Sequence, residues 1–159
     1  MASKAYSDTT VASNKSKEQI ERLLKSHNVK AIRFTSLPSF ALLEFVYQPK
    51  VDAQIPYRVT IKPQISGDFS RKPEKELDRA ERQVWRVAYW WLKSKFEAID
   101  FGLVEFQQEF LPYMLLGNGQ GESDTVSQLF AKSLAGYVTT GNEVFSGLRP
   151  AIPQKGTED

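Results

Sequence analysis

Hydrophobic and polar residues repeat with the period of an α-helix from Pro73 to Gly102, the longest such stretch in the chain. At about 100° per residue, the apolar side chains fill an arc of about 200°. Pro73 suits the first turn of a helix, and Gly102 suits the position just after its end. The pattern therefore predicts one long helix over residues 73–102. Its apolar arc contains Leu77, Val84, Trp85, Ala88, Tyr89, Trp91, Leu92, Phe96 and Ile99.

Three stretches before this helix alternate between apolar and polar residues, a pattern typical of half-buried β-strands. They cover residues 30–35, 40–48 and 55–62. Because the connections at 36–39 and 49–54 are short, neighbouring strands are expected to pair antiparallel in a meander. The inward face of this predicted sheet carries Ile32, Phe34, Ala41, Leu43, Phe45, Tyr47, Ile55, Tyr57, Val59 and Ile61.

A short helix is predicted before the strands. Ser16 and Gln19 have the spacing of a capping box, which predicts a helix that starts at Ser16 and ends near His27. The residues before it, 1–15, are polar and without periodicity, and they predict a flexible tail.

Two further helices are predicted after the long one. Apolar residues at helical spacing cover residues 103–116, where Pro112 bends or ends the run. The glycine-rich residues 117–121 are interpreted as a turn between helices, and Ser123 or Asp124 is expected to cap a last helix.

The predicted element order is α-β-β-β-α-α-α, which indicates the α+β class. We expect a three-stranded antiparallel meander packed by the long helix, with a short N-terminal helix and two shorter C-terminal helices. The predicted organisation is a tail over 1–15, a single domain over 16–135, and a mostly irregular tail over 136–159.

Charge is distributed unevenly along this chain of net charge +2. Residues 1–95 contain 18 basic and 10 acidic residues, a net charge of +8, whereas residues 96–159 contain 3 and 9, a net charge of −6. A basic half of this kind favours a polyanionic partner. The alternative is head-to-tail self-association, in which the acidic half of one copy binds the basic half of another.

The side of the long helix opposite its apolar arc carries four cations and an indole within a sector of about 60°. Cations neutralise phosphates, and a base stacked on an aromatic ring contributes about 1–3 kcal/mol. Three cations on the outer face of the sheet could extend this track. The alternative is an ordinary solvated helix face, with Asp78 paired to Arg82 and the indole packed under a neighbouring helix. The candidate nucleic-acid-binding residues are Arg79, Arg82, Arg86, Trp90, Lys93, Arg33, Arg58 and Lys62.

Catalytic chemistry has little support in the sequence. The chain has no cysteine and a single histidine, His27, so neither a catalytic triad nor a two-histidine metal site can be built. We interpret His27 as a support for the end of the first helix. Glu105 with Glu109, and Glu97 with Asp100, have the spacing of carboxylate pairs on solvated helices. We therefore predict a non-enzymatic protein without catalytic residues, metal or cofactor; an enzyme of this sequence would have to use carboxylates and a metal.

The cellular compartment is predicted from three features that the sequence lacks. No run of apolar residues approaches the length that spans a bilayer, and the N-terminus lacks the apolar stretch of a secretory signal. The lack of cysteine fits a reducing environment. The sequence predicts a cytoplasmic protein without membrane partners.

Four motifs follow one another in the second half of the chain: Arg82-x-x-Trp85-Arg86, Glu97-Ala98-Ile99-x-x-Gly102, Glu109-Phe110-Leu111-Pro112-Tyr113 and, after a glycine-containing loop, Thr125-Val126. Through these motifs, residues 13–135 resemble a family of small uncharacterised proteins encoded by bacteriophages and other mobile elements. The resemblance implies no activity. It implies a mobile-element context, where small helper proteins act in replication, recombination or defence.

The α-β-β-β-α order is also similar to the double-stranded RNA-binding fold, whose second helix begins with a basic cluster that contacts phosphates. Here that helix begins with Glu74, Glu76 and Asp78, and only Lys75 lies between them. This departure argues against the same mode of RNA binding, and a shared fold does not transfer function.

Two function classes follow. The first is a non-enzymatic nucleic-acid-binding helper of a phage or mobile element, which binds DNA or RNA with the basic-aromatic helix face. The second is a protein–protein interaction module, either a self-assembling adaptor or an inhibitor of a host or phage protein. The expected partners are accordingly nucleic acid, a second copy of the chain, or another protein.

Overall fold

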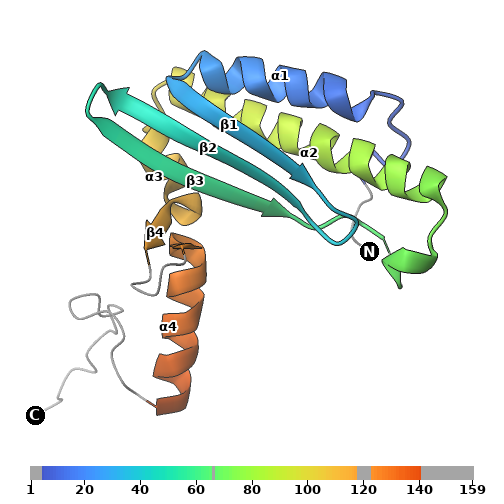
Figure 1. The fold of residues 1–159 in the computed structure, drawn as a ribbon. Helices are drawn as coiled ribbons and strands as arrows, with labels where there is room; N and C mark the ends of the chain where they lie inside the picture. Colours follow the sequence, from blue (N-terminus) through green and yellow to red (C-terminus); the bar gives the residue numbers. More distant parts are fainter. Residues whose placement is uncertain (1–4, 66, 118–122, 141–159) are drawn as a thin grey trace, which may run out of the picture.

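The computed structural model describes residues 5–65, 67–117 and 123–140, and it has the α+β architecture predicted from the sequence (Figure 1). The elements are α1 (Ser13–Lys25), β1 (Val29–Ser36), β2 (Ala41–Lys50), β3 (Ala53–Ile61), the 3-10 turn η1 (Phe69–Arg71), α2 (Glu74–Asp100), α3 (Phe106–Phe110), the 3-10 turn η2 (Leu111–Tyr113), β4 (Leu115–Gly117), β5 (Ser123–Thr125) and α4 (Val126–Thr140).

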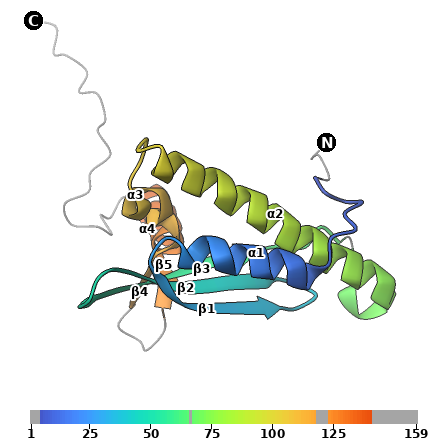
Figure 2. The same cartoon turned by 90° about the horizontal axis from the view of Figure 1, so that it is seen from above.

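β1, β2 and β3 form an antiparallel sheet in that order, with β1 and β3 at its edges. Phe34 pairs with Leu43, which pairs in turn with Val59, so the apolar residues of all three strands lie in register on one face. Both α1 and α2 cover this face (Figure 2). The alternation of apolar and polar residues therefore sets which face of the sheet is buried.

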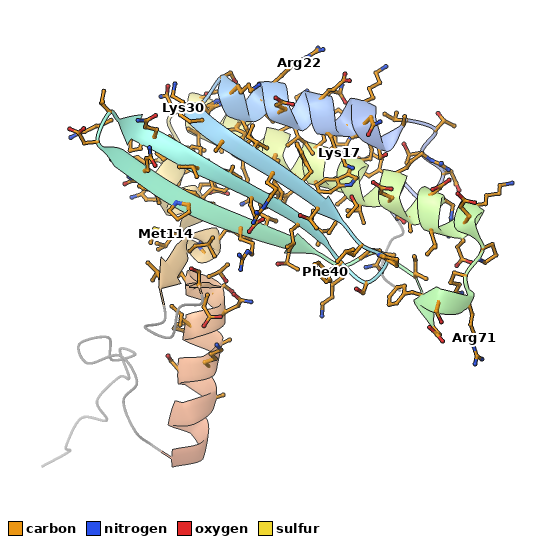
Figure 3. The ribbon with its side chains drawn as sticks, in the orientation of Figure 1. Lys17, Arg22, Lys30, Phe40, Arg71 and Met114 are labelled. Atoms are coloured by element: carbon orange, nitrogen blue, oxygen red, sulfur yellow. The ribbon has the colours of Figure 1, made fainter. Side chains whose placement is uncertain are left out.

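α1 and α2 lie side by side and run in the same direction. Early in both helices, Lys17 Nζ lies 3.0 Å from Glu81 Oε1. Later, the Nη1 of Arg86 donates to Gln19 Oε1 at 2.9 Å. At the end of α1, His27 Nε2 lies 2.8 Å from Asp100 Oδ1. Three polar contacts thus fix the position of α1 along α2. Figure 3 shows Lys17 where α1 meets α2.

The core is built around aromatic side chains of α2, α3 and the sheet. Trp85 is fully buried, and its Nε1 donates to Ser36 Oγ at 3.0 Å. At the other end of the core, Phe106 and Phe110 pack against Phe45, Tyr57 and Phe96. The resulting core extends along α2 from Val84 to Phe96.

α2 ends at the glycine that the sequence predicts. Gly102 has φ +80°, its N–H donates to Ile99 O at 2.9 Å, and the N–H of Leu103 donates to Ala98 O at 3.0 Å. These two bonds are the Schellman arrangement, which closes a helix with a left-handed residue.

Replacing Gly102 by alanine is expected to lower the free energy of unfolding by about 1 kcal/mol, because a Cβ disfavours positive φ. Open space surrounds the site, so the backbone alone carries the cost. Gly117→Ala is the matched control, since Gly117 also has open space but no positive φ. Urea denaturation measures both variants, and equal effects would contradict this explanation.

Several predicted boundaries are corrected. α1 begins at Ser13, with Ala12 as its N-cap, so Ser16 lies inside the helix and residues 13–15 are not part of a tail. The last helix begins at Val126 rather than after Ser123 or Asp124, because residues 123–125 form β5.

The capping box of α4 uses Thr125. Thr125 Oγ1 accepts from the N–H of Gln128 at 3.2 Å, and Gln128 Oε1 accepts from the N–H of Thr125 at 2.8 Å. The sequence interprets residues 117–121 as a turn between two helices, but the residues on either side of this stretch are strands. β4 and β5 pair there as an antiparallel hairpin. Residues 118–122 themselves, and 141–159 of the predicted C-terminal tail, lie outside the described residues.

The region after α2 attaches to the β3 edge of the sheet. Tyr57 forms a single antiparallel bridge with Met114, and the N–H of Val126 donates to Met114 O at 2.9 Å. α4 then extends away from the sheet, with its main contacts to η2 and β5 (Figure 1). Within the described ranges, no helix combines the length and the apolar character that crossing a bilayer requires.

Candidate functional site

The centre of the basic-aromatic face of α2 is Trp90, whose side chain is 37% exposed. The guanidinium carbon of Arg86 lies 5.1 Å from the centroid of its ring, and Lys93 Nζ lies 4.9 Å from it. These residues are four positions before and three positions after Trp90, so the helix itself brings both cations to the indole. The arrangement concentrates two positive charges on a partly exposed ring.

This geometry changes the role predicted for Trp90. Because two cations already lie over the indole, it offers less free ring surface to a stacking base than the sequence suggests. Its strongest contribution is to hold Arg86 and Lys93 in place. Neither cation is neutralised closely: Arg86 bonds to the neutral amide of Gln19, and Lys93 lies 3.8 Å from Glu97.

Arg79 and Arg82 lie at the beginning of the same helix face, beside the segment that precedes α1. Together with residues 7–10 and Ala12 they line an open cleft. Among the ion pairs of the described residues, neither arginine has a carboxylate partner, and the pairing of Asp78 with Arg82 considered from the sequence is not formed.

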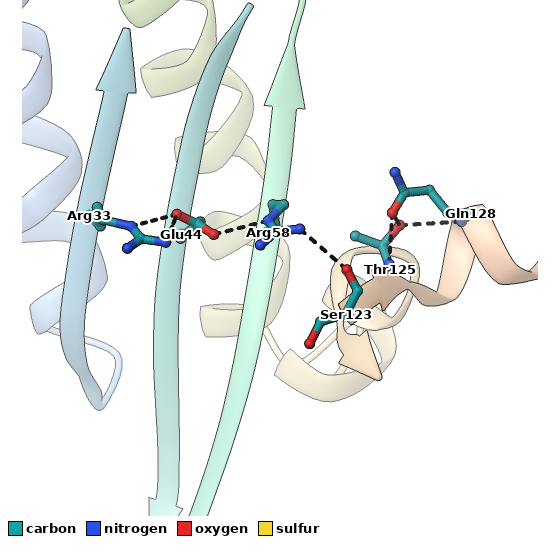
Figure 4. Close-up of polar contacts among 6 residues, drawn as sticks. All are labelled: Arg33, Glu44, Arg58, Ser123, Thr125 and Gln128. Atoms are coloured by element: carbon teal, nitrogen blue, oxygen red, sulfur yellow. Dashed lines mark hydrogen bonds and ion pairs between the residues drawn. The ribbon is translucent and has the colours of Figure 1, made fainter. Parts of the chain in front are cut away.

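Arg33 and Arg58 lie on the opposite side of the molecule. They pair with Glu44 from the two neighbouring strands, Arg33 Nε at 2.6 Å from Oε2 and Arg58 Nε at 2.9 Å from Oε1 (Figure 4). Arg58 also donates through Nη1 to Ser123 O at 3.3 Å, which ties β3 to β5. Lys62 follows the end of β3 and is exposed.

The expectation that these sheet cations extend the helix track is therefore wrong. α2 covers the face of the sheet that carries Phe34, Leu43 and Val59, whereas residues one position away in each strand project from the other face. The single residue Glu44 also offsets one of the two arginine charges. The structure brings together Arg79, Arg82, Arg86, Trp90 and Lys93 along α2 and separates them from Arg33 and Arg58.

Three carboxylates have a pKa below their ordinary range: the exposed Asp68, which accepts hydrogen bonds from Ser70, and the partly buried Glu44 and Glu81. Burial raises the pKa of Glu44, but hydrogen bonds and charge from Arg33 and Arg58 outweigh burial and leave the pKa lowered. Burial also raises the pKa of Glu81, and the opposing hydrogen bonds to Lys17 and Ser36, with the charge of Lys17, again leave the pKa lowered.

These shifts predict that the protein loses stability in acid. As pH falls below the ordinary value of 4.5, the unfolded carboxylates bind protons before the folded ones, so the stabilisation is present above that pH and is lost as pH falls through the lowered pKa values. Urea denaturation at a series of pH values measures the slope. The Glu44→Gln and Glu81→Gln double variant is expected to lose less stability than the wild type between neutral pH and about pH 3. Equal losses would contradict the assignment.

The carboxylate pairs noted in the sequence have structural partners. Glu109 pairs with Lys95, Asp100 with His27, and Glu105 caps α3. His27 packs against Phe96 at 4.1 Å, and its Nδ1 lies 2.8 Å from Leu23 O, so it joins the end of α1 to the end of α2. In the described part of the chain, no group of three acidic or histidine side chains could hold a metal ion.

The residues that sequence reasoning missed are those of the segment before α1. Residues 7–10 are polar, and the segment 7–12 has no periodicity and matches no motif, so nothing in the sequence places it beside Arg79 and Arg82. Comparisons with protein-family models, with curated proteins and with solved structures find no match to this chain. The resemblance to phage-encoded proteins therefore stays a prediction.

Proposed function

We propose that this protein is a non-enzymatic nucleic-acid-binding helper that contacts the phosphate backbone with the outer face of α2, in the replication or recombination of a phage or other mobile element. The observation that carries the proposal is the uncompensated charge of three of the four cations of this face, Lys93 being paired with Glu97 at 3.8 Å. Arg79 and Arg82 have no carboxylate partner among the described residues, and Arg86 bonds only to a neutral amide. Positive groups without internal partners are available to phosphates.

The arrangement of the face favours binding that is independent of sequence. Its cations follow one helix, and contacts from cations to phosphates carry no sequence information. Trp90 fixes the positions of Arg86 and Lys93 through its ring. Fixed cations lose less side-chain entropy when they bind than free ones do.

The direct experiment is fluorescence anisotropy of labelled single-stranded DNA, duplex DNA and RNA of equal length, titrated with the protein at several salt concentrations. We expect binding at low salt that weakens linearly on a log–log plot. Three to five phosphate contacts predict a slope of about −2 to −3.5 for single strands. Absence of binding at low salt to all three probes would remove the proposal.

Self-association through α4 is a second candidate function, favoured by a different observation. Phe130 is 58% exposed and Leu134 is 48% exposed on a helix that extends away from the sheet. We commit to a second copy of this chain as the partner, because residues 96–159 have a net charge of −6 and residues 1–95 a net charge of +8. The only charged residue of α4 itself is Lys132, so the contact that α4 makes would be apolar.

Light scattering across micromolar concentrations tests this second candidate. We expect a dimer or larger assembly that Phe130→Ser with Leu134→Ser converts to a monomer, whereas Ser127→Ala, an exposed site on the same helix, leaves it intact. A wild-type monomer at every concentration would exclude self-association and leave the nucleic-acid proposal unaffected.

A further inference from the structure

An open cleft of about 610 Å³ separates the segment before α1 from the first half of α2. The buried amide of Gln83 holds this segment in place, because its Nε2 donates to Ala5 O at 2.7 Å. A turn follows, in which the N–H of Thr9 donates to Tyr6 O at 3.1 Å. The cleft is lined by Ser7, Asp8, Thr9, Thr10, Ala12, Arg79 and Arg82.

Arg82 has an unused donor. Its Nε atom is shielded from solvent and has no hydrogen-bond partner within the described chain. A guanidinium has five N–H donors, and a donor removed from water is stabilised only when it meets an acceptor. Arg79, one turn earlier, also contributes its positive charge to the cleft without an ion pair among the described residues.

The segment before α1, on the side of the cleft opposite α2, adds further hydrogen-bond donors. Thr9 Oγ1 accepts from the N–H of Val11 at 3.3 Å, so its hydroxyl hydrogen remains available to a ligand. α1 begins beside the cleft with Ala12 as its N-cap, and no side chain accepts from the N–H groups of its first turn. The first turn also contains no acidic residue, so the positive end of the helix dipole adds to the two guanidinium charges.

We propose that this cleft binds a phosphate group, with Arg79 and Arg82 as its charged donors. A phosphate presents several acceptor oxygens, and a guanidinium can bind two of them at once. Because the cleft is open, the group can belong to a longer chain. The identification of that chain as nucleic acid rests on the proposed function, whereas recognition of the phosphate itself does not.

Asp8 is the one opposing charge in the lining. It is exposed and forms no ion pair with either arginine in the described structure. Its carboxylate repels a bound anion, so Asp8→Asn is expected to strengthen phosphate binding severalfold.

Titration with inorganic phosphate, followed by nitrogen–proton NMR, tests the cleft directly. We expect saturable shifts of the guanidinium N–H groups of Arg79 and Arg82 and of the backbone N–H groups of residues 7–15, which sodium chloride at equal ionic strength does not produce. Arg79→Gln with Arg82→Gln should abolish the shifts of the backbone groups. Arg71→Gln is the matched control, because Arg71 is exposed and lies before the start of α2, outside the cleft. This variant should preserve the shifts of the backbone groups. Shifts that do not saturate, or that persist in the double variant, would overturn the proposal.

A second arm uses a single-stranded oligonucleotide with the same variants. If the Arg79→Gln and Arg82→Gln variant binds it tenfold more weakly than Arg71→Gln does, the cleft holds a phosphate of the strand. If the double variant binds the oligonucleotide like the wild type, the cleft does not hold a phosphate of the strand, and the binding face of the proposed function is reduced to Arg86 and Lys93. If phosphate shifts the cleft residues but no oligonucleotide binds, the cleft stands and the proposed function fails. Circular dichroism of each variant verifies that it is folded.

Discussion

Trp85→Ala is expected to lower the free energy of unfolding by about 3–5 kcal/mol, the range for a large aromatic side chain removed from a core. Trp85 is fully buried, its ring contacts Phe34 edge-to-face at 5.3 Å, and Lys17 Nζ lies 5.1 Å above it. Its removal also leaves Ser36 without the Nε1 donor. The cavity, the lost ring contacts and the lost hydrogen bond all act in the same direction.

Trp90→Ala is the matched control, because it deletes the same side chain from the same helix at a position that is 37% exposed. We expect a clearly smaller cost, about 1–2 kcal/mol, since more than a third of its surface is already exposed and its removal opens no cavity in the core. Urea denaturation followed by circular dichroism compares the two without relying on indole fluorescence. Equal destabilisation would show that α2 is oriented differently from the structure.

The charge reversal Arg82→Glu with Arg86→Glu is expected to weaken nucleic-acid binding about a hundredfold or more at low salt. A hydrogen bond to a charged group contributes about 1.5–3 kcal/mol, and 1.4 kcal/mol corresponds to a factor of ten. Two contacts are lost and two repulsions are added. The slope of the salt dependence should become shallower as well, because fewer counterions are released.

Lys30→Glu with Arg71→Glu is the control for this variant. It makes the same change in net charge at two exposed residues that lie at opposite ends of the domain (Figure 3). If binding depends on the outer face of α2, the control should bind much more tightly than the Arg82 and Arg86 variant. Equal losses would mean that only the overall charge of the protein matters. Thermal melting of both variants tests for unfolding, since Arg86 also bonds to Gln19.

Periodicity predicts this fold well wherever local pattern and tertiary burial agree. The alternation in β3 has Tyr57 and Val59 buried as expected, and Gly102 ends α2 with the positive φ that glycine favours. These features depend on residues within a few positions of one another. They can therefore be inferred from one sequence without knowledge of the rest of the chain.

The features that the sequence does not predict depend on residues distant along the chain. Periodicity places Arg33 and Arg58 on the polar face of the sheet, but it does not show that Glu44 pairs with both of them. Likewise, a helical pattern in residues 103–116 contains real helix only at Phe106–Phe110, because β4 pairs with β5 further along the chain. The candidate site is predicted only in part for the same reason. Its α2 residues were predicted from spacing, and its wall at residues 7–12 becomes visible only in three dimensions.

The edge position of β1 also constrains how copies of this chain can meet. No strand of the described chain pairs with its outer side, so a row of backbone N–H and C=O groups is left open to a foreign strand. Lys30 and Arg33 both project from this strand into solvent. Two such strands brought together would place like charges against each other, which discourages fibril-like stacking of the sheets. Growth by strand addition at the β1 edge is thereby opposed.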